Sequence, residues 1–131
     1  MDFIQFTMPE TFGETMAWLT ALASTLIGLT IMIAPSLLMR FVGLTSIRSS
    51  GISEVRSVVG GLFTGLGLAC LMLSPQPLLY FALGLAFAAI TVGRIISFVA
   101  DRSLSPFTIG ATVMEGLSAF FPLAYVFGIL I

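Results

Sequence analysis

Five charged side chains lie within or beside stretches that are otherwise apolar, and these residues have the greatest capacity for chemistry in the sequence. An ionised group inside a bilayer costs about 2.5 kcal/mol or more by insertion scales, so each needs a partner or must lose its charge. Such residues often mark substrate, ion or proton pathways. The five are Glu54, Arg56, Arg94, Asp101 and Glu115.

Arg94 and Glu115 are the two charged residues expected to lie deepest in the membrane. Counted at about 1.5 Å per residue from their helix ends, Arg94 lies about 10 Å deep and Glu115 about 14 Å deep. If their helices are antiparallel neighbours, the two side chains reach a similar depth and we expect an ion pair between them. Glu54 and Arg56 point to different sides of one helix, so we expect them to close this cluster rather than pair with each other.

The predicted cluster has two interpretations, and the sequence leaves both open. In the first, the charges form a structural lock that fixes the register of the helices. In the second, they line a small polar cavity, open to the cytoplasm, that binds a ligand or relays a proton through Glu115. A metal site built from Glu54, Asp101 and Glu115 is disfavoured because the interleaved arginines would repel the cation. We therefore assign no catalytic residue and no metal ligand.

The composition indicates an integral membrane protein. The chain has 131 residues, of which 58% are hydrophobic and only 8% are charged, far from the usage of soluble domains. It contains no histidine and no lysine, which excludes an imidazole-bound haem, a histidine metal site and a lysine Schiff base. We expect no cofactor. A net charge of −1 without a basic run excludes a nucleic-acid partner.

Four apolar stretches are each long enough to cross a bilayer core of about 30 Å. They predict one all-α domain over residues 1–131, a bundle of four transmembrane helices, antiparallel in sequence order, that span about 14–39, 54–73, 78–100 and 107–129. Residues 1–13 lack the positive flank of a signal peptide. We interpret them as a segment on the membrane surface, with a disordered tail as the alternative.

The second stretch carries a strip of small residues at every fourth position. On a helix this spacing forms one face where a neighbouring backbone can approach closely. We therefore expect the strip to pack against another helix of the bundle. Its members are Ser57, Gly61, Gly65 and Ala69.

The five arginines predict the orientation in the membrane. Arg40, Arg48 and Arg56 surround the first connection, and Arg94 and Arg102 flank the third. Because basic residues concentrate in cytoplasmic loops, we expect residues 40–53 and 101–106 to be cytoplasmic. Both termini are then expected on the periplasmic side.

A series of motifs spans nearly the whole chain after its first dozen residues. The motifs are Glu54-Val55-Arg56 with Gly60-Gly61 and Gly65-Leu66-Gly67, Gly93-Arg94 with Ser97, the turn from Asp101 to Ser105-Pro106, and Glu115. Together they resemble the bacterial membrane family catalogued as domain of unknown function 4345. More distantly, the chain is similar to DoxX-like and DoxD-like four-helix proteins, some of which are associated with quinol-linked respiratory complexes. The resemblance implies a four-helix membrane fold and a shared Glu/Arg set at Glu54, Arg56, Arg94 and Glu115. We expect the protein in a bacterial inner membrane.

Three hypotheses of function follow. The leading one is a non-enzymatic accessory or interaction subunit of a membrane assembly, because four short helices with small-residue faces offer a packing surface to other helices. The second is a small transporter or ligand-binding protein that uses the arginine–glutamate cavity. The third is a quinone-linked redox component. The expected partners are the lipid bilayer, other membrane proteins or a second copy, and, under the second hypothesis, a small molecule.

Overall fold

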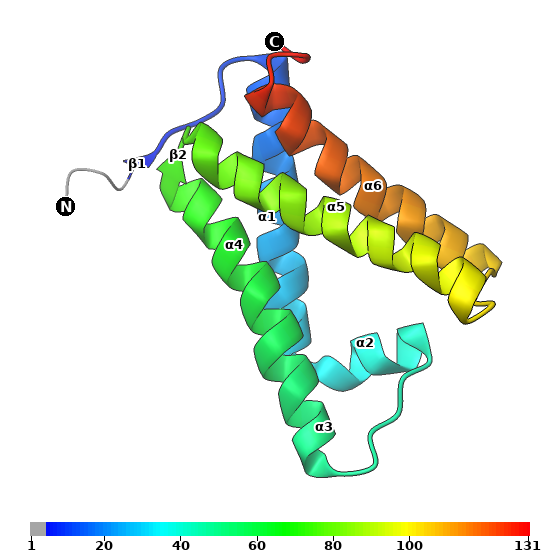
Figure 1. Cartoon of the computed structure of the whole chain (residues 1–131). Coiled ribbons are helices and arrows are strands. Elements are labelled where there is room, and N and C mark those ends of the chain that lie inside the picture. Colours follow the sequence, from blue (N-terminus) through cyan, green and yellow to red (C-terminus); the bar gives the residue numbers. More distant parts are fainter. Residues whose placement is uncertain (1–4) are drawn as a thin grey trace.

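The computed structural model describes residues 5–131 and has four helices long and apolar enough to cross a membrane. Consecutive long helices run in opposite directions (Figure 1). The predicted all-α bundle of four antiparallel helices is therefore confirmed. The long helices are α1 (Phe12–Ile33), the continuous helix formed by α3 (Ser49–Glu54), the π-helical turn η1 (Val55–Val59) and α4 (Gly60–Met72), then α5 (Pro77–Ala100) and α6 (Pro106–Val126).

The first long helix ends earlier than the sequence predicted. Residues 14–39 were expected to form one span, but α1 stops at Ile33 and a separate short helix, α2 (Pro35–Val42), follows the break at Ala34. A proline inside a helix lacks the N–H donor and clashes with the preceding turn, whereas at the first helical position it is tolerated. Pro35 therefore ends α1 and begins α2.

The N-terminal segment is tied to the turn between α4 and α5. Strand β1 (Gln5–Phe6) pairs in parallel with β2 (Leu73–Ser74), and the Thr7 hydroxyl donates a hydrogen bond of 2.7 Å to the Ser74 carbonyl. The surface segment expected over residues 1–13 falls partly outside the described residues, which begin at Gln5. From there on, the backbone follows this turn toward the start of α1 (Figure 1).

Helices α1 and α4 approach almost to backbone contact. A Cβ atom added to Gly28 would lie 2.8 Å from the Gly60 carbonyl oxygen, and one added to Gly67 would lie 2.6 Å from the Ala21 carbonyl oxygen. Such distances leave no room for a side chain, so glycine is required for this packing. The small-residue face that joins the two helices thus runs through Gly60 and Gly67.

The strip predicted to pack is a different face of the same helix, and that prediction was wrong within this chain. No neighbouring atom of the described chain lies within 4 Å of a Cβ added to Gly61 or Gly65. Adjacent residues on a helix are 100° apart, so the strip at Gly61 is rotated away from the contact at Gly60. In this strip Ser57 and Gly65 are exposed, and Gly61 and Ala69 are partly exposed.

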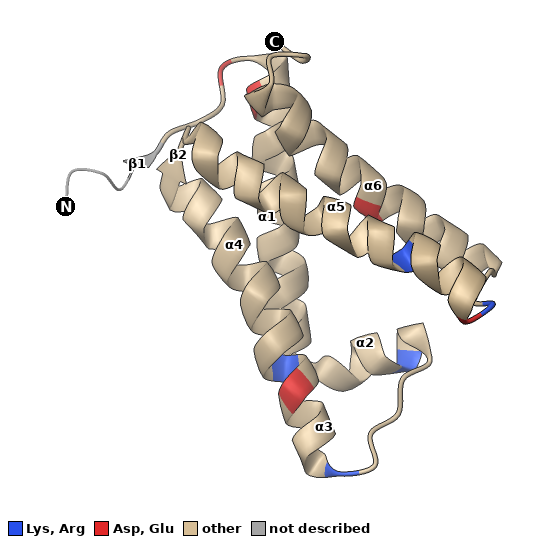
Figure 2. Cartoon of the chain, viewed as in Figure 1, with Lys and Arg blue, Asp and Glu red and all other residues tan. Residues whose placement is uncertain are grey.

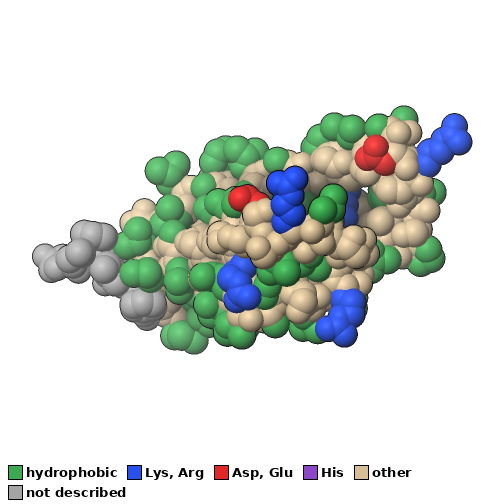
Figure 3. All heavy atoms as spheres, turned by 90° about the horizontal axis from the view of Figure 1, so that it is seen from below, with side chains coloured by type: hydrophobic (Ala, Val, Ile, Leu, Met, Phe, Trp, Pro, Cys, Tyr) green, Lys and Arg blue, Asp and Glu red, His purple; other side chains and the backbone are tan. Residues whose placement is uncertain are grey.

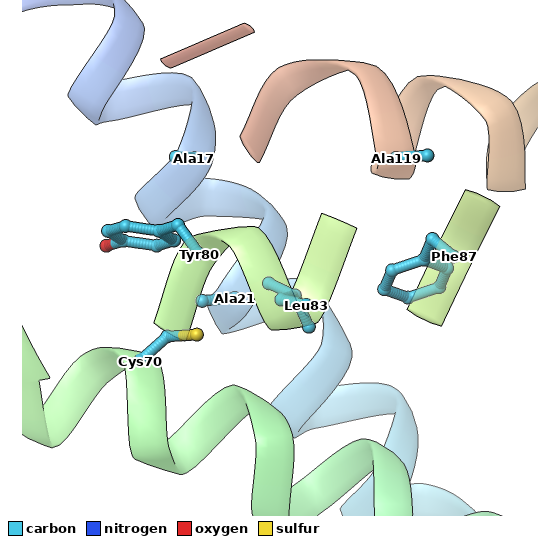
Figure 4. Packing of buried hydrophobic residues seen from close by; sticks show 7 residues of the cluster. All are labelled: Ala17, Ala21, Cys70, Tyr80, Leu83, Phe87 and Ala119. Atoms are coloured by element: carbon cyan, nitrogen blue, oxygen red, sulfur yellow. The ribbon is translucent and has the colours of Figure 1, made fainter. Parts of the chain in front are cut away.

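The larger of two buried clusters among the described residues lies at the end of the bundle where all four long helices meet, and the smaller one joins Ile31, Met39 and Val55. Tyr80 and Leu83 of α5 are at most 1% exposed and extend toward α1 and α4 (Figure 4). Away from this end, the α1–α4 pair and the α5–α6 hairpin diverge (Figure 1). The core cluster contains Ala17, Ala21, Cys70, Tyr80, Leu83, Phe87 and Ala119.

Candidate functional site

Arg94 of α5 and Glu115 of α6 form an ion pair with two parallel hydrogen bonds. Arg94 Nε donates to Glu115 Oε2 and Arg94 Nη2 donates to Oε1, each at 2.9 Å. This two-point geometry is the strong form of an arginine–carboxylate contact. The pair predicted from helix depth is confirmed. The side chains are 32% and 18% exposed, respectively, so both remain partly open to their surroundings.

Close packing of α5 on α6 sets the register of the pair. A Cβ atom added to Gly84 would lie 2.7 Å from Leu123 Cγ and 3.2 Å from the Ala119 carbonyl oxygen. The two helices therefore approach closely at the core end of the hairpin. From that contact, each helix runs without interruption to the level of the ion pair.

Hydroxyl groups hold the turn at the other end of the hairpin. Ser97 Oγ donates a hydrogen bond of 2.8 Å to Asp101 Oδ2 and lies 3.0 Å from Ser103 Oγ. Ser105 caps the start of α6 through a reciprocal arrangement with Thr108, which satisfies backbone donors that a helix N-terminus leaves free. These contacts fix the α5–α6 turn next to the ion pair.

An open hollow of about 340 Å³ lies beside Arg94, and Ile90 and Gly93 form part of its lining. Arg94 lines it together with the hydroxyl-bearing residues Ser97, Ser103 and Thr108. Arg94 uses Nε and Nη2 for Glu115, and within the described chain its Nη1 has no hydrogen-bond partner. A guanidinium retains further donors in this geometry. The hollow can therefore offer N–H and O–H groups to a small polar or anionic molecule.

The other three residues of the predicted cluster do not join the ion pair, which corrects that prediction. Glu54 is exposed at the end of α3. The Arg56 guanidinium donates to the carbonyl oxygens of Met32 and Ile33, which lack partners because α1 ends there. Asp101 is exposed and accepts from Ser97 at the turn. Figure 2 shows the charges distributed over separate elements rather than gathered at one centre.

The reason for this correction is the separation of the two helix pairs. Glu54 and Arg56 lie at the far end of the α1–α4 pair, where it has already diverged from α5 and α6 (Figure 1). Similar depth in the membrane is therefore not enough to bring Glu54 and Arg56 to the Arg94–Glu115 pair. Among the described residues, no three carboxylate or cysteine side chains gather as a metal site would require.

Glu14 is a buried carboxylate that the sequence reasoning missed. It is 8% exposed, and its Oε2 accepts a hydrogen bond of 3.3 Å from the Glu10 backbone N–H. The Thr11 hydroxyl accepts from the Glu14 backbone N–H at 3.2 Å. A threonine followed three residues later by glutamate is the signature of a helix N-terminus. That pattern could have identified Glu14 as a helix-capping residue rather than a site residue.

A family model described as "Domain of unknown function (DUF4345)" matches residues 14–127. The chain belongs to this family. The matched region of this DUF4345 protein includes both partners of the ion pair and reaches from the start of α1 to just past the end of α6. No curated protein and no solved structure matches the chain. The more distant likeness to DoxX-like and DoxD-like proteins, and with it the quinone link, stays a prediction.

Proposed function

We propose that this DUF4345 protein is a non-enzymatic protein of a bacterial inner membrane that acts as an accessory or interaction subunit of a larger membrane assembly. This proposal rests on the partial exposure of the Arg94–Glu115 pair, which the rest of the chain does not cover completely. The pair lies inside helices long enough to span a bilayer. At the level of the pair, the α5–α6 hairpin has diverged from α1 and α4 (Figure 1). The chain itself leaves the pair partly uncovered.

An uncovered ion pair at this depth favours contact with another helix. Charged groups that face hydrocarbon are costly, and in membrane proteins they usually face other protein or water. Next to each partner in the sequence stands an exposed apolar side chain, Ile95 after Arg94 at 52% exposure and Met114 before Glu115 at 65%. A partner helix laid across this half of the hairpin would remove the pair from lipid and pack on those side chains.

The uncovered small-residue strip of α4 gives independent support. Gly61 and Gly65 leave open space at the surface of the helix, and small residues spaced by four allow a second helix to come close. The partner is either another membrane protein or a second copy of this chain. The mass of the complex distinguishes the two cases, because a second copy of this chain would add 13.9 kDa to the mass of the monomer.

The orientation that we propose follows the arginine distribution. Arg40, Arg48 and Arg102 lie in or next to the connections at the end of the molecule opposite the α4–α5 turn. By the positive-inside rule that end is cytoplasmic. Residues 40–53 and 101–106 are then cytoplasmic and both termini periplasmic.

Photo-crosslinking in cells tests the proposed interaction. A photoreactive residue at position 95 lies beside the ion pair, and one at position 85 is a matched control because Leu85 is 53% exposed on the same helix. We expect a discrete protein adduct from position 95 and none from position 85. The combined replacement Arg94→Leu with Glu115→Leu should abolish the adduct. Equal adducts from both positions, or only lipid adducts from position 95, would refute the proposal.

The hollow beside Arg94 favours a second candidate, a ligand-binding membrane protein. Its support is that Arg94 and three hydroxyl-bearing residues line one space of about 340 Å³, a size within the range of small-molecule sites of about 300–1,000 Å³. Native mass spectrometry of the gently extracted protein tests it. A small-molecule adduct that survives extraction and is lost on Ser103→Ala would favour the ligand site, and an adduct of protein mass would favour the accessory subunit.

A further inference from the structure

An apolar cleft opens where the two helix pairs diverge. It has a volume of about 340 Å³ and lies between the second half of α1, helix α2 and the start of α6. The rings of Phe41 and Phe107, whose centroids are 5.9 Å apart, close one side by joining α2 to α6. Leu26 and Ala34 mark its extent along α1, about 12 Å at the helical rise per residue. The cleft therefore follows α1 for about two helical turns, and apart from Thr30 its lining is apolar.

The walls of the cleft are open to the surroundings. Leu26, Leu37 and Phe41 are 55%, 52% and 75% exposed. The cleft adjoins the part of α1 that leads to α2, which places it in the half of the bilayer next to the arginines. Apolar walls at that depth contact acyl chains rather than water. A hydrocarbon chain matches both the shape and the chemistry of the cleft.

The positively charged side chain of Arg40 lies at the open end, or mouth, of the cleft. A small hollow of about 160 Å³ is lined by Leu37, Arg40 and Phe41, and two of these residues also line the cleft. Arg40 is exposed. Among the described residues, the ion pair joins Arg94 to Glu115 and does not involve Arg40. The guanidinium of Arg40 is thus available to an anion that lies where the cleft meets the membrane surface.

The surroundings of Arg40 suit a phosphate group. On its other side, Arg40 shares a hollow of about 440 Å³ with Ser36, Thr45 and Ser46, so hydroxyl donors lie near the guanidinium. Further basic side chains are spread over this face of the molecule (Figure 3). Arginine binds phosphate through charge-assisted hydrogen bonds, and basic residues near a membrane surface attract anionic lipids.

We propose that the cleft holds an acyl chain of an anionic phospholipid whose phosphate is bound by Arg40. The tail lies along α1 above α2, and the headgroup meets the polar face of α2. This lipid site is separate from the Arg94–Glu115 pair and does not depend on the function proposed above. Charge complementarity at the mouth distinguishes this occupant from an apolar helix, which would leave Arg40 without a partner.

Native mass spectrometry of the full chain in detergent tests the headgroup. The protein is titrated with phosphatidylglycerol and, separately, with phosphatidylcholine of the same acyl chains. We expect one phosphatidylglycerol to bind in preference to phosphatidylcholine. Arg40→Gln should weaken phosphatidylglycerol about fivefold, the contribution of one arginine near an anionic surface, and weaken phosphatidylcholine less, because the choline ammonium already offsets the phosphate charge that Arg40 binds. The control Arg48→Gln removes the same charge at the same end of the molecule, away from the apolar cleft, and should change neither.

A second pair of variants tests the tail. Ile27 lines the cleft and is 48% exposed, whereas Leu29 is 40% exposed on the same helix outside it. Ile27→Trp should weaken both lipids by about tenfold because the larger indole occupies space in which the tail would otherwise bury its apolar surface, and Leu29→Trp should weaken neither. Equal affinity of the wild type for the two lipids would overturn the proposal. So would equal effects of the Arg40 and Arg48 changes, binding of inorganic phosphate as tight as that of the lipid, or a dimer that occupies the cleft.

Discussion

Replacing Arg94 and Glu115 singly and together tests whether their ion pair stabilises the fold. Arg94→Leu leaves Glu115 without its two donors, and Glu115→Leu leaves the Arg94 guanidinium facing an apolar side chain. The double replacement removes both charges and fills the space with hydrocarbon. An ion pair therefore predicts that the double variant loses far less stability than the sum of the two single variants.

The expected magnitude follows from the contact and its exposure. Breaking a fully buried ion pair by removing one partner costs about 3–5 kcal/mol, and a hydrogen bond to a charged group contributes about 1.5–3 kcal/mol. Arg94 is 32% exposed and Glu115 is 18% exposed, so the lower part of these ranges applies. We expect each single replacement to cost about 2–3 kcal/mol and the double replacement about 1 kcal/mol or less, a coupling of at least about 3 kcal/mol.

Equilibrium unfolding of the four proteins in mixed detergent micelles measures this coupling. Additive losses would refute the argument, because two side chains that do not interact cannot compensate for each other. The same double variant separates the two interpretations of the pair. A stable variant that retains its partner adduct indicates a structural lock, whereas a stable variant that loses it indicates that the charges themselves are recognised.

Three further predictions concern packing and topology. Gly28→Ala should lower thermal stability in detergent because its Cβ would meet the backbone of α4, whereas Gly61→Ala should be neutral or slightly stabilising because its site is open; equal effects would contradict the assigned contact face. Gly84→Leu should separate α5 from α6, since even a Cβ there lies 2.7 Å from Leu123 Cγ, and reduced folding yield measures it. Cysteines at positions 49 and 103 should resist an impermeant external thiol reagent in intact cells, and labelling of both would reverse the proposed orientation.

The sequence predicted the long helices well because length and apolarity decide them. It also predicted the Arg94–Glu115 pair, since helices joined by a short turn must be antiparallel neighbours and residues of similar depth then meet. It extended the first span through Pro35 because the following residues are still largely apolar. Pro35 indicated the break between α1 and α2, but the continuous apolar run favoured a single longer helix.

The packing face of α4 could not be chosen from the sequence. Gly60 and Gly61 begin two small-residue faces, and periodicity describes both equally well. Their environments differ only through the position of α1, which is a tertiary fact. The same applies to Arg56. Its spacing from Glu54 is evident in the sequence, but its role as a cap for the last carbonyls of α1 depends on where that helix ends.

The divergence of the two helix pairs gives the molecule unequal widths at its two ends. It is narrow where the C-terminus and the core cluster lie and broad where α2, α3 and the α5–α6 turn lie (Figure 1). In a bilayer, such a wedge displaces more lipid from one leaflet than from the other. The protein should therefore partition toward membranes whose curvature expands the leaflet on the arginine side, and crowding many copies together should itself bend the membrane in that sense.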